Sequence, residues 1–160
     1  MPPGSPSAPA LQFILRAASE ADVPFLLALR RQTMDRHLAR SGRPADDAAH
    51  LARILYHWEH ARIVLVGGEP AGLLKAYRGA SAWHVVQIQV APAWQGQGLG
   101  ACLLREVLAQ ADAAGLPTRL EVLKTNPARR LYERLGFRIV ADAGDDQYQM
   151  ERPARPPGAR

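Results

Sequence analysis

The segment from His84 to Gly115 carries the clearest chemical signal in the sequence, because an apolar strand pattern, a glycine-rich loop and an amphipathic helix pattern follow one another there. The first N–H groups of a helix have no intrahelical partner and lie at the positive end of the helix dipole. A strand–loop–helix turn can therefore bind phosphate oxygens through its backbone. In the loop, glycine occupies positions 96, 98 and 100, which removes Cβ atoms where a diphosphate must approach the main chain. We predict a pyrophosphate-binding loop.

The same loop, extended by Ala101, also fits the G-x-G-x-x-A fingerprint of dinucleotide-binding folds. In those folds the first glycine directly follows its strand, and several further strand–helix units come after it. Here residues 91–95 intervene, and only one more convincing helix pattern follows. Glu121 lies about 20 residues on, where that fold needs an acid for ribose, but it falls inside an apolar strand pattern. A diphosphate loop of another kind is therefore favoured.

Length and composition indicate one domain with a real core, since 48% of the 160 residues are hydrophobic. No apolar run reaches the roughly 20 residues of a membrane span, and the N-terminus lacks the pattern of a signal peptide. We expect a cytoplasmic protein without a membrane partner. Proline and small residues predict disordered tails at residues 1–10 and 153–160, around a single domain at residues 11–152.

The net charge of +5 suits an anionic ligand such as a nucleotide-bearing cofactor, and it would also suit nucleic acid. No run of five or more lysines and arginines occurs, so we expect no nucleic-acid partner.

Few residues have the pattern of a metal site. The single cysteine, Cys102, excludes a disulfide framework and any multi-cysteine zinc site, and we interpret it as a small buried filler of a helix. His57 and His60 are three residues apart, but the sequence provides no third ligand. We therefore predict no metal, and we regard these histidines, with His37 and His50, as ordinary surface or interface residues.

Hydrophobic spacing and turn signals predict an alternation of strands and helices. A four-stranded antiparallel meander, interrupted by two helices after its first strand, should come before the glycine loop. The next strand must run parallel to the last strand of the meander, since a right-handed crossover is the default. The expected strands are 11–17, 62–67, 71–77, 83–90, 118–123, 137–141 and 147–150. The first and third expected helices are 23–39 and 98–114, and a fourth should start at Asn126-Pro127. The second should be capped by Asp46 or Asp47 and should have the apolar stripe Leu51, Ile54, Leu55 and Trp58.

At this point the chain resembles the GNAT superfamily of acyl-CoA-dependent N-acyltransferases. The resemblance rests on the loop Gln95-x-x-Gly98-x-Gly100 after the strand IQVAP, together with the later segment NPARRLYERLGF, and it covers about residues 11–150. It implies an α/β (α+β) fold with a mixed, mostly antiparallel sheet that splays open between strands 4 and 5, flanked by about four helices. The gap would hold the pantetheine arm of acetyl-CoA.

The resemblance also implies which residues bind the cosubstrate. The strand residues Ile88, Gln89 and Val90 would offer main-chain hydrogen bonds to pantetheine, and an N–H near Gln89 or Val90 would polarise the thioester carbonyl. Asn126 matches the family's asparagine that touches the cofactor arm. Backbone amides of the loop would hold the pyrophosphate, and the loop consists of Gln95, Gly96, Gln97, Gly98, Leu99 and Gly100.

Tyr132 matches the family's general acid. When an amine attacks a thioester, a thiolate with an intrinsic pKa of about 8 to 9 leaves, and a nearby hydroxyl can protonate it. A tyrosine that merely packs its helix on the sheet is the structural alternative.

The general base is less directly indicated. A protonated amine with a pKa near 10 cannot attack, so a carboxylate or histidine should accept its proton. In some family members a fourth-strand glutamate does this, but this chain has Gln87 and Gln89 there. Other members use a fifth-strand glutamate, which Glu121 matches, although it could equally pair with Arg119 or Lys124 on the sheet surface. A further, weaker candidate is His84.

By resemblance, the function is transfer of an acetyl group to a primary amine by direct attack through a tetrahedral intermediate. The acceptor would be a small molecule or a peptide or protein amine, and a homodimer is compatible with this function. The alternative is a non-catalytic CoA-binding sensor or interaction module. The residues expected to line the acceptor site are Arg36, His37, Arg40, Arg43, Trp83 and Tyr148.

Overall fold

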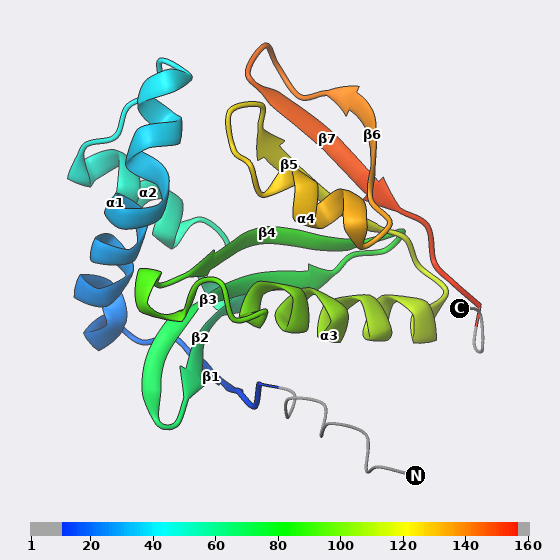
Figure 1. The fold of residues 1–160 in the computed structure, drawn as a ribbon, viewed down its shortest axis with the longest axis horizontal. Helices are drawn as coiled ribbons and strands as arrows, with labels where there is room; N and C mark the ends of the chain where they lie inside the picture. Colours follow the sequence, from blue (N-terminus) through cyan, green and yellow to red (C-terminus); the bar gives the residue numbers. More distant parts are fainter. Residues whose placement is uncertain (1–10, 157–160) are drawn as a thin grey trace, which may run out of the picture.

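A seven-stranded sheet forms the centre of the molecule, with helices on both faces (Figure 1). The computed structural model describes residues 11–156, so the expected tail at residues 1–10 and the last part of the other tail, residues 157–160, lie outside it. The strands are β1 (Ile14–Ala17), β2 (Ala61–Val66), β3 (Glu69–Arg78), β4 (Trp83–Val90), β5 (Thr118–Leu123), β6 (Arg138–Asp142) and β7 (Gln147–Arg152). The helices are α1 (Val23–Arg40), α2 (Asp47–Leu55), α3 (Leu99–Ala114) and α4 (Arg129–Arg134).

The sheet topology is the one expected from the sequence. The strand order is β1-β2-β3-β4-β5-β7-β6, and every neighbouring pair is antiparallel except β4 and β5. The mixed, mostly antiparallel α/β fold with four helices is therefore confirmed. Among the described residues, no helix has both the length and the apolar character that a bilayer span requires.

The parallel strands β4 and β5 pair along only part of their length. Partners are Trp83 with Thr118, His84 with Arg119, and Val85 with Leu120, after which the strands separate. Figure 1 shows β5 and β7 rising away from β4. The register between β3 and β4 also shifts here, with Val86 as an extra residue in β4. A bulge of this kind bends and twists its strand, and so helps β4 to diverge. The predicted splay is confirmed.

Each face of the sheet has its own apolar core. On one face α3 buries Leu99, Leu103, Leu104, Val107 and Leu108 against the sheet. On the other face the α1 residues Leu26 and Leu29 and the α2 residue Ile54 pack on Ile63 and Leu73.

An ion pair joins the C-terminal end of β7 to α3. Arg152 is buried and donates two hydrogen bonds to the Asp112 carboxylate at 2.8 and 3.3 Å. Asp112 Oδ1 also accepts a hydrogen bond from the backbone N–H of Arg155 at 2.9 Å. The part of the expected C-terminal tail that the structure describes thus lies against α3.

Several local predictions were wrong. The first strand begins at Ile14 rather than Leu11. The second helix does not have the predicted apolar stripe, because α2 ends at Leu55. Only Ile54 of that stripe is fully buried, since Leu51 and Leu55 are exposed and Trp58 lies in a separate short turn. As allowed by the sequence, α2 is capped by Asp46, whose side chain accepts from Ala49 N at 2.9 Å. Cys102 is half-buried rather than a buried filler.

The last helix also begins later than predicted. The assigned start of α4 is Arg129, because residues 126–128 form a turn in which Asn126 Oδ1 accepts a hydrogen bond from Ala128 N at 3.0 Å. The asparagine still caps the local backbone, but it does so ahead of the regular helix.

Lys75 connects β3 to the C-terminal end of α2. The side chain is fully buried, and its Nζ donates to the carbonyl oxygens of Arg53 at 3.1 Å, Ile54 at 2.8 Å and Tyr56. These carbonyls belong to the helix end, where acceptors lack intrahelical partners and a cation is favoured by the dipole. Burial lowers the pKa of Lys75 to about 7, with further lowering from Arg53 and Arg30.

We expect Lys75→Met to lower the free energy of unfolding by about 1–3 kcal/mol, because buried carbonyls would lose their donor. Urea unfolding of both proteins at one pH measures the difference. Lys124→Met, on a half-exposed side chain, is the control and should change the midpoint little. A midpoint for Lys75→Met equal to that of the parent would contradict this role.

Candidate functional site

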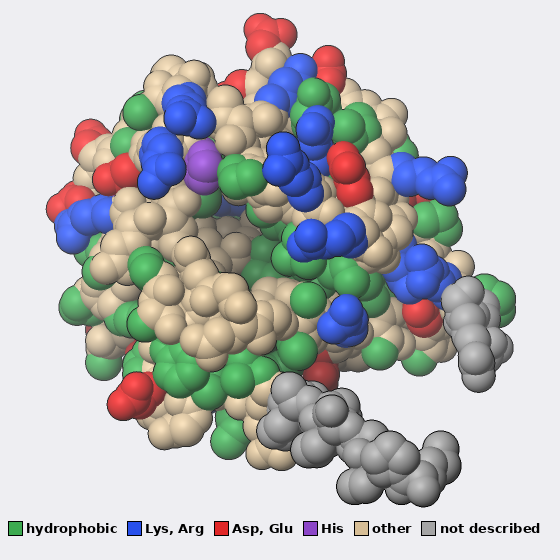
Figure 2. Space-filling view, viewed as in Figure 1, with side chains coloured by type: hydrophobic (Ala, Val, Ile, Leu, Met, Phe, Trp, Pro, Cys, Tyr) green, Lys and Arg blue, Asp and Glu red, His purple; other side chains and the backbone are tan. Residues whose placement is uncertain are grey.

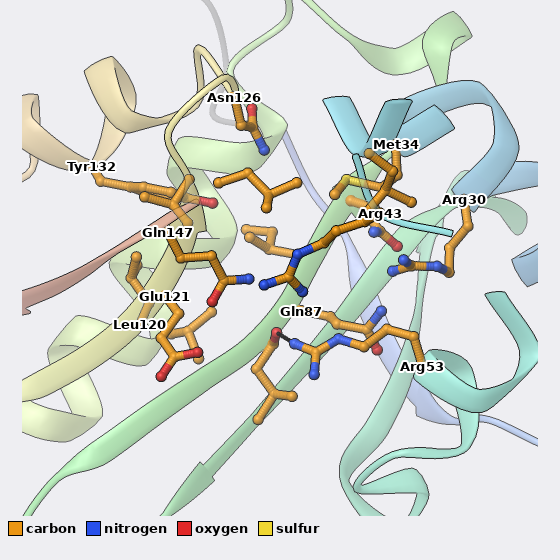
Figure 3. A pocket seen from close by; sticks show the side chains of 17 residues that line it. Arg30, Met34, Arg43, Arg53, Gln87, Leu120, Glu121, Asn126, Tyr132 and Gln147 are labelled. Carbon is orange, nitrogen blue, oxygen red and sulfur yellow. Dashed lines mark hydrogen bonds between the residues drawn. The ribbon is translucent and has the colours of Figure 1, made fainter. Parts of the chain in front are cut away.

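The gap between β4 and β5 opens into a cavity of about 360 Å³. Its walls come from elements far apart in the sequence: α1 and the loop after it, α2, the separated halves of β4 and β5, α4 and β7. Figure 3 shows Tyr132 and Glu121 on one side of this cavity and Arg30 and Arg53 on the other. The lining residues are Arg30, Met34, Leu38, Arg43, Arg53, Val85, Val86, Gln87, Ile88, Gln89, Leu120, Glu121, Val122, Leu123, Asn126, Tyr132 and Gln147.

Polar contacts join the two sides of the molecule across this cavity. Arg43, in the loop after α1, forms a two-pronged ion pair with Asp146 in the turn between β6 and β7, with Nη2 2.8 Å from Oδ1. Nearby, Thr125 Oγ1 donates to the carbonyl of His37 at 3.3 Å. These contacts connect α1 to the β5–β7 half of the sheet, so the cavity is bounded by residues from both halves.

The glycine loop has the geometry expected of an anion site. Gly96 and Gly98 have φ values of 78° and 81°, in the left-handed region that other residues rarely adopt. The first backbone hydrogen bond of α3 runs from Cys102 N to Gly98 O at 3.0 Å, so the N–H groups of Leu99, Gly100 and Ala101 precede it. Left-handed glycines followed by a helix N-terminus orient backbone N–H groups outward. The arrangement can bind phosphate oxygens.

The two glutamine side chains of the loop support its backbone. Gln95 Nε2 donates to the carbonyl of Val90 at 2.9 Å, and Gln97 Nε2 donates to the carbonyl of Ala93 at 3.2 Å. The first bond joins the loop to the end of β4, and the second joins it to the short turn at Pro92–Trp94. The side chains therefore hold the loop shape, and the backbone remains the group available to an anion.

A surface groove runs from this loop toward the cavity. It has a volume of about 560 Å³ and lies between α1, the end of β4 and the turn before α4. Figure 2 shows the molecule hollowed in this region, with lysine and arginine side chains gathered above the hollow. The groove brings together seven of the predicted cosubstrate and acceptor residues: Ile88, Gln89, Val90, Gln95, Asn126, Arg36 and His37. Ile88, Gln89 and Asn126 line both the groove and the cavity.

Tyr132 reaches the cavity from α4. Its residue is 7% exposed, its ring meets Phe137 edge-on, and its hydroxyl points into the cavity in Figure 3. Burial raises the pKa of Tyr132 to about 12, which keeps the phenol protonated at neutral pH. A protonated hydroxyl beside the strand gap is able to donate a proton.

Glu121 is not engaged in either of the ion pairs that the sequence left open. Arg119 pairs with Glu151 at 2.8 Å, and Lys124 pairs with Asp142 at 3.3 Å. No ion pair joins Glu121 to another described residue, and its carboxylate lines both the central cavity and a second cavity of about 240 Å³. An exposed carboxylate at the gap, with no ion-pair partner among the described residues, is available to accept a proton.

A stack of aromatic rings borders the second cavity. Tyr77 stacks on His57 and His60 at 4.9 Å and on His84 at 5.0 Å. Burial, followed by repulsion from Arg119 and His57, lowers the pKa of His84. His84 thus favours its neutral form and lines the same cavity as Glu121.

The structure places a third residue able to bind a metal beside two of the histidines. Glu59 lies 3.5 Å from His57 Nδ1 and 3.6 Å from His60 Nε2. Within the described chain, this is the grouping whose ligand atoms lie close enough to hold a cation. The Glu59 side chain is 66% exposed, and a surface contact between a carboxylate and two imidazole rings accounts for the same geometry without a metal.

Sequence reasoning missed the basic side of the cavity. Arg30 and Arg53 were not identified, because the spacing of α1 and α2 gave no sign of which residues face the sheet. The buried side chains of Lys75 and His50 belong to the same region, so the prediction that His50 is a surface or interface histidine was wrong. An inward-pointing lysine in the apolar strand pattern AGLLKAY was the one available signal.

The six residues predicted to line the acceptor site have different positions. Arg43 lines the central cavity, whereas Arg36 and His37 line the surface groove. Trp83 packs against the α3-side core, and Tyr148 lies beneath the cations of Lys124 and Arg129. Arg40 is exposed near the end of α1.

The chain thus combines a mixed sheet splayed between β4 and β5 with a glycine-rich loop that leads into α3. Residues 27–137 match the family described as the acetyltransferase (GNAT) family. The match covers more than half of the chain, and the chain belongs to this family.

Solved structures agree with this fold. An acetyltransferase from Thermus thermophilus is 26% identical, with a TM-score of 0.69 over 89% of this chain and 97% of that one. The PaiA N-acetyltransferase from Thermoplasma acidophilum, in complex with coenzyme A, is 17% identical, with a TM-score of 0.67 over 89% and 99%. The ribosomal-protein-S18-alanine N-acetyltransferase from Escherichia coli is 20% identical, with a TM-score of 0.64 over 93% and 98%.

Proposed function

We propose that this protein is an N-acetyltransferase that moves an acetyl group from acetyl-CoA to a primary amine by direct attack through a tetrahedral intermediate. The proposal rests chiefly on one observation: an uncommitted carboxylate, Glu121, and a buried phenol, Tyr132, line one cavity at the gap between β4 and β5. Family membership supports acyl transfer, and the structurally similar PaiA N-acetyltransferase was solved in complex with coenzyme A.

The residues of the groove fit a phosphopantetheine chain. Backbone N–H groups from Gly96 to Gly100 would bind the diphosphate, and the free edge of β4 at Ile88–Val90 would bind the pantetheine amides. Asn126 would contact the same arm where it lines both groove and cavity. When bound there, acetyl-CoA supplies an acetyl group activated as a thioester.

Three groups would assist the transfer. Glu121, directly or through a water molecule, accepts the proton that the ammonium must lose before its nitrogen can attack. A backbone N–H near Gln89 or Val90 donates to the carbonyl oxygen as negative charge develops on it, which is typically worth a few kcal/mol of barrier. Tyr132 donates its proton to the departing thiolate as the carbon–sulfur bond breaks. The attacking nitrogen loses its second proton to solvent as the amide forms, and solvent also returns a proton to the tyrosine.

The alternative is a CoA-binding module without catalysis. The absence of a fourth-strand glutamate favours it, since Gln87 and Gln89 occupy that strand. The protonated Tyr132 and the free Glu121 favour the enzyme.

Calorimetric titration with acetyl-CoA, followed by thiol release across a panel of amines, separates the two functions. We expect binding with saturation and thiol release that depends on at least one amine. Binding without amine-dependent release on any acceptor would favour the module, and absence of binding by any coenzyme A species would overturn both.

Tyr132→Phe should lower kcat by about 10²–10⁴-fold, the usual contribution of general acid–base catalysis, with little change in acetyl-CoA affinity. The phenyl ring keeps the packing on Phe137 and removes only the proton donor. Steady-state thiol release and acetyl-CoA titration measure the two quantities. Tyr148→Phe, on a tyrosine of β7 that faces Lys124, is the matched control. Unchanged turnover in Tyr132→Phe would remove this role.

Glu121→Gln should lower kcat at pH 7, again by about 10²-fold or more, and the deficit should shrink as the pH approaches the amine's pKa. At high pH the acceptor is already a free base and needs no proton acceptor. Rates of parent and variant are compared from about pH 7 to about pH 9.5, a range that approaches the pKa of an alkyl amine, with one acceptor. A deficit of the same size at every pH would indicate a structural role for Glu121. Glu151→Gln, also on the sheet surface, is the control.

A further inference from the structure

The wall of the cavity formed by α1 and α2 carries two guanidinium groups, Arg30 and Arg53, that form no direct ion pair with any residue from 11 to 156. Arg30 is 5% exposed. Its Nε donates to His50 Nδ1 at 3.1 Å, and His50 Nε2 in turn donates to Asp35 Oδ1 at 2.6 Å. This chain of bonds fixes the orientation of the guanidinium. Its two terminal nitrogens have no hydrogen-bond acceptor among residues 11–156, and the residue lines the cavity.

Arg53 provides a second guanidinium from α2. One terminal nitrogen donates to the Val86 carbonyl at 2.9 Å, where β4 leaves β5, and the cation lies 4.9 Å from the Tyr56 ring centre. Its other nitrogens have no acceptor in the described part of the chain. Burial lowers the pKa of Arg30 to about 10, and repulsion from Arg53 adds to this effect. Asp35 acts in the opposite direction on Arg30, and Glu121 does so on Arg53, but neither carboxylate forms a direct ion pair with either guanidinium group.

Unpartnered amides lie beside these cations. Gln87 is 6% exposed, and both its side-chain oxygen and nitrogen lack a partner; Gln89 is 7% exposed, and its side-chain oxygen lacks one. Both residues line the cavity, and Figure 3 shows the Gln87 side chain between Arg30 and Arg53. Buried polar groups are normally hydrogen-bonded, and an unpaired one costs about 1–3 kcal/mol. A polar ligand would satisfy these atoms.

We propose that the acceptor is a small amino-carboxylate, whose carboxylate binds Arg30, Arg53 and Gln87 while its amine lies toward Glu121. This inference rests on the proposed N-acetyltransferase function and names its substrate class. Planar guanidinium groups match a carboxylate through paired N–H donors. The unpaired Gln87 nitrogen adds a neutral donor to the same subsite.

The charge distribution disfavours an amine that carries no anion. Three guanidinium groups and one carboxylate line the cavity, and Arg43 is already paired with Asp146. An ammonium that enters alone would add a further positive charge near Arg30 and Arg53, with only Glu121 to offset it. A molecule with both charges matches the cationic wall and the Glu121 wall at once.

Matched acceptor pairs test the inference directly. Each pair consists of an amino acid and the same compound with its carboxylate replaced by an uncharged primary amide, offered at saturating acetyl-CoA. We expect the acid to have a kcat/KM about tenfold to a hundredfold higher than its amide, as loss of a charged hydrogen-bonding partner predicts.

Substitutions then locate the subsite. Arg30→Gln should remove most of the preference for the acid by raising its KM, and should leave kcat/KM for the amide and acetyl-CoA affinity nearly unchanged. Arg30→Lys should restore part of the preference, because it keeps the charge. Arg138→Gln, on an exposed arginine of β6, is the control and should leave kcat/KM unchanged for both the acid and the amide.

The outcomes distinguish this inference from the function on which it rests. If amides or simple amines have the same kcat/KM as amino acids, the proposed carboxylate subsite is wrong, but the proposed acetyltransferase function is unaffected. The same holds if Arg30→Gln folds, binds acetyl-CoA and keeps the full preference for the acid. If no acceptor of either kind releases thiol, the proposed function itself fails.

Discussion

The separation of β4 from β5 is the constraint on which the rest of this structure depends. Two parallel strands that pair only from Trp83 to Val85 leave backbone groups beyond that point without sheet partners. Such groups are costly when buried, so each needs another partner or a ligand. Two carbonyls are satisfied inside the protein, because the Val86 carbonyl accepts a hydrogen bond from Arg53 and the Val90 carbonyl accepts one from Gln95. The remaining free edge of β4 lies next to a groove and to a loop of outward-facing amides. The gap is therefore stable as an open site, and bound ligand can complete its hydrogen bonding.

The wall beside the gap contains buried charged groups, where charge is energetically unfavourable. Lys75 is fully buried beneath α2 and fixes the end of that helix. It also positions Arg53, because the Arg53 carbonyl is one of the lysine's hydrogen-bond acceptors. Arg30 is held from the other side by His50 and Asp35. Three cations in one region repel one another, and burial favours their neutral forms, as the lowered pKa of Lys75 indicates. This arrangement lowers stability unless an anion is present, which makes it a feature suited to binding.

The sequence was sufficient for the fold because the governing signals are local. Alternating apolar residues, the turn at Gly67-Gly68, the glycine loop and the stop at Gly115 each act within a few residues, and the crossover rule then determines the parallel pair. Strand β1 and α2 were less well predicted because packing decided their limits: α2 buries His50 and Ile54, not an apolar stripe. Tyr132 and Glu121 were predicted as catalytic residues from a motif and a strand position, and both line the cavity. Arg30 and Arg53 could not be, since their shared cavity exists only once α1 and α2 lie against β4.

The two ends of the site differ in how the sequence encodes them. The loop end depends on backbone N–H groups and on two left-handed glycines, so it tolerates many side chains and is recognisable by spacing alone. The cavity end depends on side chains from several separate elements, with Arg43 and Asp146 joining residues 103 positions apart. A substitution at one of these positions changes the charge of the cavity without disturbing the loop. It follows that chains of this fold can keep one acyl donor while differing in acceptor. The acceptor of this chain must therefore be sought in the charge of the α1–α2 wall rather than in the family motif.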